Sequence, residues 1–336
     1  MIGNAIQHAS PWPHRWAIAL ACATFPLVWV GGLVTTTDSG MAVPDWPNTY
    51  GYNLFLYPWK SWITGPWALF LEHSHRLIGA AVGLLTITLL IVLWRNDERR
   101  WMRWMGVAAL ALVVLQGVLG GMRVLFDERT LAMFHGCTGP LFFAVTVAMV
   151  VLTSRRWRLG ESESSRTLCP SIRRLAVVVS VLVYLQIVVG AVLRHVPAGA
   201  DPATFAMAVR FHLFLAAIVT FHVAALAFMI VFRARSIKPL AGLATTLSIL
   251  VMIQLALGAG TWIVKFSVPA WASQVISTGS VAIQEGGWLQ THVITAHQAV
   301  GSLLLVTSLS LTLFCLRLPP RTQTHDVVPR RLEAAV

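Results

Sequence analysis

Four histidines lie at similar depths in four separate apolar segments, and they are the residues best placed to do chemistry: His75, His135, His212 and His297. Each stands a few residues inside the same end of its segment, which at about 1.5 Å rise per residue places all four roughly 6 to 12 Å from that end. A neutral imidazole is costly in an apolar medium but is a good axial ligand for haem iron. The pattern therefore predicts two haem sites with two axial histidines each.

Two other interpretations of these histidines are weaker. A single buried histidine is more often a hydrogen-bonded core residue than a ligand, but four at equivalent places in a repeated unit favour ligation. Zinc is disfavoured because no cysteine and few carboxylates accompany them. Four other histidines do not share the pattern. His73 and His292 point away from the neighbouring His75 and His297, and we expect ordinary hydrogen-bonded roles for His195 and His222.

Charged residues near the histidines form a second group of candidates. Glu72 precedes His75 by three residues and so shares its helix face, and an acid inside an apolar span is expensive enough to be a functional candidate. Its structural alternative is an ion pair or hydrogen bond that steadies His75 or Arg76. Four arginines near the same helix ends are candidates to bind haem propionates, unless they only reach the membrane interface: Arg76, Arg123, Arg194 and Arg210.

The elements that must position these residues are transmembrane helices. The 336-residue chain is 57% hydrophobic and 11% charged, and its mean hydropathy is +0.71, which is too apolar for a soluble domain. We predict an all-α integral membrane protein with eight transmembrane helices: 16–34, 68–94, 104–125, 131–152, 175–193, 207–232, 240–264 and 289–316.

A repeated motif organises these spans. A glutamine precedes a glycine by four residues at Gln116–Gly120, Gln186–Gly190 and Gln254–Gly258, with a weaker echo from Leu27 to Gly31. Such residues are expected to pack helices together rather than to react. Because these segments alternate with the histidine segments, we predict two pseudo-symmetric four-helix bundles, residues 1–153 and 175–318, joined by a cytoplasmic linker, 154–174, and followed by a cytoplasmic tail, 319–336.

The net charge of +12 does not indicate a nucleic-acid partner. Eighteen of the 25 basic residues fall at the N-terminus, in alternate loops and at the C-terminus. The positive-inside rule places these parts in the cytoplasm and the four histidines near the outer face. Contact with anionic membrane lipids then accounts for the charge. The first apolar segment has no cleavage site after it, so we expect a retained span in the cytoplasmic membrane of a bacterium.

The first outer loop, residues 35–66, is long and rich in proline and tryptophan. We predict an ordered aromatic lid, although interfacial tryptophans would give a similar composition. Three cysteines lie within spans and Cys169 lies in a cytoplasmic loop. No outward-facing pair is present to form a disulfide, so thiol redox chemistry is not predicted.

Several segments together resemble the haem A synthase family, and the resemblance covers essentially the whole chain. They are Gly31-Gly32-Leu33-Val34, the loop run from Asp38 to Pro47, the segment Glu72-His73-Ser74-His75-Arg76, Phe134-His135-Gly136, and the helices of His212 and His297. The loop run followed by the Glu72 segment is the specific part. Membership would imply an eight-helix enzyme that oxidises a methyl group of haem O to the formyl group of haem A, for terminal cytochrome oxidase.

The resemblance also implies roles for residues and partners. His75 and His135 would hold the substrate haem, His212 and His297 would hold a haem b, and Glu72 would be the essential acid beside the reacting methyl. Haem O synthase is the expected substrate donor, and cytochrome oxidase or its assembly factors are the expected acceptors of the product.

Two departures from the family pattern are visible. Many members carry a cysteine pair in the first outer loop, where this chain has Val43 and Thr49, so no role of such a pair operates here. The last histidine is followed by Gln298 rather than by an arginine like Arg76, which weakens the case for an equivalent propionate contact.

The predicted ligation constrains the chemistry. A bis-histidine haem has no open position for dioxygen, which favours removal of electrons through the ring with water as the oxygen source. The main alternative is a di-haem cytochrome b that only transfers electrons; it would need the same four histidines but neither Glu72 nor a lid. A transporter built on a repeat would require polar residues and broken helices near the membrane midplane, and few are present.

Overall fold

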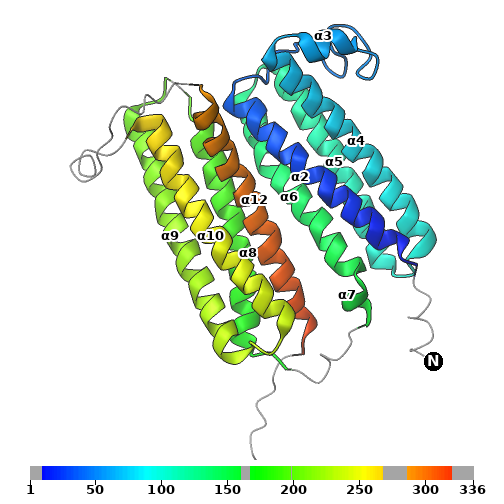
Figure 1. Ribbon diagram of the computed structural model, residues 1–336, viewed down its shortest axis with the longest axis vertical. Helices are drawn as coiled ribbons and strands as arrows, with labels where there is room; N and C mark the ends of the chain where they lie inside the picture. The colour runs from blue at the N-terminus through cyan, green and yellow to red at the C-terminus, as the bar shows by residue number, and fades with distance from the viewer. Residues whose placement is uncertain (1–9, 160–166, 198, 268–285, 320–336) are drawn as a thin grey trace, which may run out of the picture.

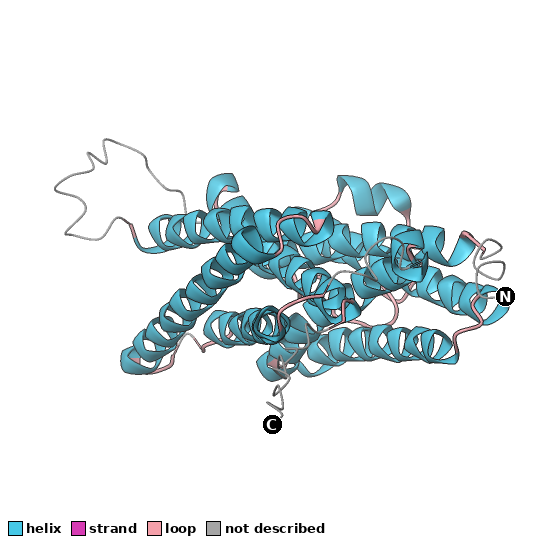
Figure 2. Ribbon diagram, turned by 90° about the horizontal axis from the view of Figure 1, so that it is seen from below, coloured by secondary structure: helices cyan, strands magenta, loops and turns pink. Residues whose placement is uncertain are grey.

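The computed structural model describes residues 10–159, 167–197, 199–267 and 286–319. These residues form helices and loops, with one isolated β-bridge between Thr49 and Tyr52 (Figures 1 and 2). Eight of the helices in this part of the chain are long: α2 (Trp12–Thr36), α4 (Trp67–Asn96), α5 (Arg100–Phe126), α6 (Arg129–Thr153), α8 (Pro170–Arg194), α9 (Pro202–Arg233), α10 (Lys238–Phe266) and α12 (Trp288–Arg317). Two short helices accompany them, α3 (Trp59–Thr64) in the loop between α2 and α4 and α7 (Arg155–Leu159) after α6.

The eight long helices confirm the predicted all-α fold and the eight predicted spans. Each is long and apolar enough to cross a membrane. They extend beyond the predicted spans because backbone hydrogen bonding continues through polar residues at the membrane surface. At α9, for example, Pro202 fits the first helical position, and the Asp201 carboxylate accepts the N–H of Ala203 at 3.0 Å. The predicted linker 154–174 contains α7 and the first turn of α8.

The long helices pack in two rings of four. In the first ring α2 contacts α4, α4 contacts α5, α5 contacts α6, and α6 contacts α2. In the second ring α8, α9, α10 and α12 contact one another in the same order. The rings stand side by side (Figure 1), and they meet through α12 against α2 and α6 and through α6 against α8. The contacts are symmetric between the rings. If α2, α4, α5 and α6 are exchanged in that order with α8, α9, α10 and α12, the same pairs of helices remain in contact.

Apolar packing within and between the rings forms the core. One buried cluster includes Leu20, Leu89 and Met102 of the first ring. The other includes Ile230 and Leu240 of the second ring and extends across the junction onto α6. The most buried helices of the eight are α6 and α12, which lie at the junction of the rings. Since α6 and α12 carry His135 and His297, one histidine of each predicted pair is mounted on a central helix.

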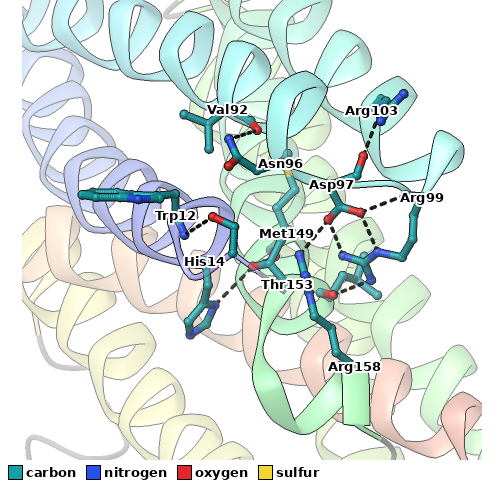
Figure 3. Close-up of polar contacts among 12 residues, drawn as sticks. Trp12, His14, Val92, Asn96, Asp97, Arg99, Arg103, Met149, Thr153 and Arg158 are labelled. Atoms are coloured by element: carbon teal, nitrogen blue, oxygen red, sulfur yellow. Dashed lines mark hydrogen bonds and ion pairs between the residues drawn. The ribbon is translucent and has the colours of Figure 1, made fainter. Parts of the chain in front are cut away.

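Asp97 stabilises the end of the first ring that lies away from the histidines, through ion pairs and hydrogen bonds (Figure 3). Its buried carboxylate pairs with Arg99 at 2.7 Å and Arg158 at 2.8 Å. The carbonyl of Asp97 accepts from Arg103 Nε at 2.7 Å, and Arg99 Nη1 donates to the carbonyl of Leu152 at 2.9 Å. Burial alone would raise the pKa of the Asp97 carboxyl, but the hydrogen bonds and charges of these arginines lower it overall. The network joins α4, α5, α6 and α7.

Candidate functional site

The four predicted histidines meet as two pairs. His75 on α4 and His135 on α6 have ring centroids 6.3 Å apart and ring planes at 75°. His212 on α9 and His297 on α12 have ring centroids 6.3 Å apart and ring planes at 67°. The two rings of helices therefore repeat the same arrangement of imidazoles, each between its second and fourth long helix.

The separation of the imidazoles fits one metal ion between them. Two metal–nitrogen bonds of about 2 Å, with the distance from each nitrogen to its ring centre, add up to about 6 Å. No group of three or more His, Cys, Asp or Glu side chains gathers as a metal site in the described residues. A protein-only zinc site would lack its remaining ligands, whereas a porphyrin brings its own four nitrogens and leaves two axial positions for histidine.

The hydrogen bonds of the imidazoles agree with axial ligation. His135 Nδ1 donates to the carbonyl of Gln116 at 3.1 Å, which leaves Nε2 as the nitrogen with a free lone pair. His297 Nδ1 is buried and has no hydrogen-bond partner among the described residues. The second site therefore lacks the carbonyl bond that fixes the tautomer of His135 at the first site.

A glycine of the preceding helix makes room for each ligand ring. A Cβ atom built on Gly31 would lie 2.9 Å from His75 Nε2, too close for any real side chain. The other three contacts are nearly as tight, with built Cβ atoms 3.2 Å from the His135 ring at Gly120, 3.3 Å from the His212 ring at Gly190 and 3.2 Å from the His297 ring at Gly258. These are the glycines of the repeated motif, so each copy of the motif supplies the glycine that contacts a ligand histidine.

The glutamines of the motif hold the helices that carry the ligands. Gln186 Nε2 donates to the backbone carbonyl of His212 at 3.1 Å, and Gln254 Nε2 donates to that of His297 at 3.0 Å. Gln116 instead donates its side chain to Thr138. The expected packing role of the motif is confirmed by these helix-to-helix bonds. The first copy has Leu27 in place of glutamine and retains only the glycine contact.

Glu72 is buried and binds both Arg76 and the first outer loop. Its side chain is 2% exposed, and its two carboxylate oxygens accept from Arg76 Nη2 at 2.7 Å and from the backbone N–H of Val43 at 2.9 Å. Arg76 in turn donates to the carbonyls of Asp45 at 2.6 Å, Asn48 at 2.8 Å and Val43 at 2.9 Å. The ion pair that we weighed as the structural alternative for Glu72 is therefore present. The guanidinium of Arg76 is occupied by the loop, which disfavours its predicted contact with a propionate.

The residues around His75 anchor the lid as well. His73 is buried; a hydrogen bond of 3.0 Å joins its Nδ1 to the Thr49 hydroxyl, and its ring contacts Tyr57 and Trp62 at centroid distances of 5.1 and 5.4 Å. Trp62 Nε1 donates to the Ser74 hydroxyl at 3.1 Å. In the segment 72–76, four side chains thus hold the loop and the fifth, His75, faces His135. The sequence singled out Glu72 and His75 but missed the anchoring roles of His73 and Ser74.

The lid also contacts α5, and hydrogen bonds within the lid stabilise its conformation. Arg123 Nη2 donates to the carbonyl of Gly40 at 3.1 Å, and the Trp46 ring lies against Gly121. The Asp45 carboxylate accepts the backbone N–H groups of Tyr50 at 2.8 Å and Gly51 at 2.7 Å. Partial burial would raise the pKa of this carboxyl, but these two hydrogen bonds lower it overall. The loop is thus bound to α4 and α5 over much of its length, as an ordered lid requires.

The remaining arginine candidates differ in their surroundings. Arg194 donates to the Thr36 hydroxyl at 2.6 Å, to the carbonyl of Gly32 at 3.3 Å and to the side-chain oxygen of Gln298, so it bridges the two rings of helices. Arg210 is exposed. No ion pair involving either arginine is found in the described residues, which leaves their charges available to an acidic ligand group.

Three further histidines have ordinary hydrogen-bonded roles, as expected for His195 and His222. Nδ1 of His195, His222 and His292 donates to the carbonyl four residues earlier, at 2.8, 2.8 and 2.9 Å. Burial lowers the pKa of His195, which lies just past the end of α8, against the opposing effect of that hydrogen bond.

Comparison with known proteins points to one family. Residues 66–211 match the sequence model of the COX15-CtaA family, described as "Cytochrome oxidase assembly protein". The chain is 30% identical over 173 residues to Heme A synthase of Shouchella clausii, covering 49% of this chain and 53% of that protein. It is 24% identical over 227 residues to Heme A synthase of Hyphomonas neptunium, covering 57% and 61%, and 30% identical over 193 residues to that of Symbiobacterium thermophilum, covering 54% and 60%.

The matched region contains the first candidate site. It includes Glu72, His75 and His135 and ends one residue before His212. The matches span between half and two thirds of the length of these curated relatives. They confirm the predicted resemblance to the haem A synthase family.

Proposed function

We propose that this protein is a haem A synthase, which oxidises a methyl group of haem O to a formyl group by way of the hydroxymethyl. The observation that carries the proposal is the asymmetry of two otherwise matched histidine pairs. Glu72 lies one helical turn from His75 in the first ring, whereas alignment of His75 with His212 puts Val209 at the same place in the second ring. A cytochrome that only transfers electrons has no need of a buried acid beside one of its two sites.

The two sites take different haems under this proposal. His75 and His135 hold the substrate haem O, and His212 and His297 hold a resident haem b, which supplies one-electron redox chemistry when bound. The glycine contacts keep the imidazoles in place, and the hydrogen bond from His135 to Gln116 orients that ring for ligation. Arg123, Arg194 and Arg210 are the side chains we assign to the haem propionates.

Glu72 acts as the acid–base residue of the first site. Each oxidation step adds the oxygen of one water and releases two protons and two electrons; the electrons would leave one at a time through the haem b of the second pair to a one-electron acceptor. The second step gives a geminal diol that loses water to leave the formyl group. Protons must therefore leave the reacting carbon and the attacking water. The Glu72 carboxylate accepts two hydrogen bonds, from Arg76 and Val43, and a carboxylate has about four acceptor positions, so capacity remains to take a proton.

The lid separates this chemistry from the outside. Glu72 and Arg76 bind the lid backbone directly. The position of the Glu72 carboxylate therefore depends on the closed position of the loop. We place the protein in the cytoplasmic membrane of a bacterium with both termini in the cytoplasm and the sites near the outer face, as the distribution of basic residues predicts. Haem O synthase would supply the substrate, and cytochrome oxidase or its assembly factors would receive the product.

The proposal is tested by producing the protein with a haem O synthase in cells that otherwise make no haem A. Haem A in the extracted pigments, absent from cells that lack this chain, is the expected result. Accumulation of haem O alone, with both histidine pairs occupied by haem in the purified protein, would favour the electron-transfer alternative.

A further inference from the structure

An apolar groove of about 460 Å³ lies on the first ring, between α2, α4 and the lid helix α3. Val30 and Leu33 of α2 form one wall, Leu71 and Ile78 of α4 form the other, and Trp62 of α3 lies at its lid end. The Ser74 hydroxyl also borders the groove but accepts the hydrogen bond of Trp62. The groove therefore presents hydrocarbon and aromatic surface only.

Both walls belong to the helix segments that form the first histidine site. Val30 and Leu33 flank Gly31, the residue on which the His75 ring rests. Leu71 and Ile78 stand four residues before and three after His75, so they share its helix face. The groove therefore adjoins the first histidine site along the same two helix segments, on the side of α2 and the lid.

We propose that the groove holds the isoprenoid tail of haem O, an inference that rests on the proposed function. Haem O differs from haem b by this long branched hydrocarbon chain, which must leave the porphyrin edge and find apolar surroundings. A volume of about 460 Å³ lies in the range of specific ligand pockets, about 300 to 1,000 Å³. Because these helices cross the membrane, the tail exchanges lipid contacts for groove contacts, and its binding depends on van der Waals packing against the groove walls rather than on transfer from water.

The groove also accounts for how two similar histidine pairs select different haems. The imidazole separations are the same at both sites, so ligation alone does not distinguish haem O from haem b. The tail is the feature present in one haem and absent from the other. A tail groove beside His75 therefore directs haem O to the site that carries Glu72.

The test is a substitution that fills the groove. Leu33→Trp places an indole against the α4 wall, and Val192→Trp is the matched control, since Val192 follows Gly190 as Leu33 follows Gly31. Both are made in full-length protein that also carries His212→Ala, so that haem binds at the first site only. Titration with haem O and, separately, with haem b is followed by the absorption spectrum of the bis-histidine haem.

The expected result is selective. Leu33→Trp weakens haem O binding by about tenfold or more, because the indole occupies the space of the tail, and it leaves haem b binding within about twofold. Val192→Trp changes neither affinity. Equal weakening of both haems, or unchanged haem O binding, would overturn the proposal and indicate that membrane lipid alone fills the groove.

A second variant and a second readout keep this test separate from the proposed function. Ile78→Trp fills the groove from the opposite wall and serves if Leu33→Trp does not fold; it should give the same selective loss. Conversion is measured with Leu33→Trp and Ile78→Trp in protein that retains His212, because the haem b proposed for that pair takes part in the reaction. Continued conversion there, with an unchanged haem O affinity in both variants, would reject the groove and leave the synthase assignment standing. Absence of conversion in the wild-type protein would reject the synthase assignment, whatever the affinities.

Discussion

The two rings of helices share one scaffold for imidazole pairs and differ in what surrounds it. Both have centroids 6.3 Å apart and a glycine beneath every ligand ring. On α4, however, the ligand is surrounded by side chains that bind the lid and one another: Glu72, His73, Ser74 and Arg76. The aligned positions on α9 carry Val209, Arg210, Phe211 and Leu213. The ligand scaffold was repeated, whereas the acid and its loop contacts belong to one half only.

The largest expected effect comes from removing the acid that distinguishes the halves. Glu72→Gln keeps the size of the side chain and an acceptor for the Val43 N–H, but it cannot take a proton at neutral pH. We expect haem O to bind while haem A formation falls by about 10²-fold or more, with some hydroxymethyl product. Haem analysis of cells carrying the variant in place of the native protein measures this.

A matched control is available on the same end of the molecule. Glu128→Gln changes an exposed acid just before α6 and should leave haem A formation unchanged. Near-normal haem A formation by the Glu72→Gln variant would show that Glu72 is not catalytic and serves only as the partner of Arg76.

The next effect in size tests the independence of the halves. Replacement of His212 or His297 by alanine should remove one haem and leave the other, because the two pairs lie in separate rings of helices. His222→Ala should leave both, since His222 only bonds its own helix. Haem content per protein and the absorption spectrum of purified protein decide the matter; loss of both haems from a folded single variant would contradict a two-site molecule.

A smaller effect is expected from the glycines beneath the rings. Gly31→Ala brings a Cβ to 2.9 Å from His75 Nε2, so the imidazole must move, and we expect about tenfold weaker haem binding at the first site only. Gly83→Ala on α4 is the control, because nothing lies within 4 Å of its built Cβ. Titration of both variants with haem O measures the difference. Equal affinities for the two would show that the glycine contact does not set the position of His75.

The smallest expected effect concerns Asp97, at the end away from the sites. Its folded-state pKa is lowered from the ordinary 3.8, so its pairing stabilises the fold above that pH and is lost as the pH falls below it, through the lowered value. Asp97→Asn should reduce Tm at neutral pH and flatten the further fall of Tm below about pH 4. Thermal unfolding of both proteins across this range tests it. An unchanged pH profile in the variant would show that other groups cause the acid sensitivity.

The parts of this fold that could be predicted are those that depend on local composition. Apolar runs of about 20 residues mark spans whatever their neighbours. The shared depth of His75, His135, His212 and His297 indicates ligands, and the repeated unit predicts one pair in each half. The repeated glycines were noticed, but not that each lies under a histidine, because that contact joins different helices.

The lid contacts could not be predicted for the same physical reason. Glu72 meets Val43 across 29 residues of chain, and His73 meets Thr49 across 24. Nothing in their spacing indicates a contact. Arg76 is a propionate candidate in the sequence because the sequence shows its charge without its partners. In the structure, the carbonyls of Asp45 and Val43 bind its guanidinium.

The identity of the haems in the purified protein distinguishes a haem A synthase from an electron-transfer cytochrome most directly. Wild-type protein made in cells that contain haem O should yield haem O or haem A together with haem b, one for each histidine pair. In the His75→Ala variant, haem b should remain and the haem with the isoprenoid tail should be lost. Haem b alone in the wild-type protein, filling both pairs, would contradict the assignment of the Glu72 half to haem O and support an electron-transfer cytochrome instead.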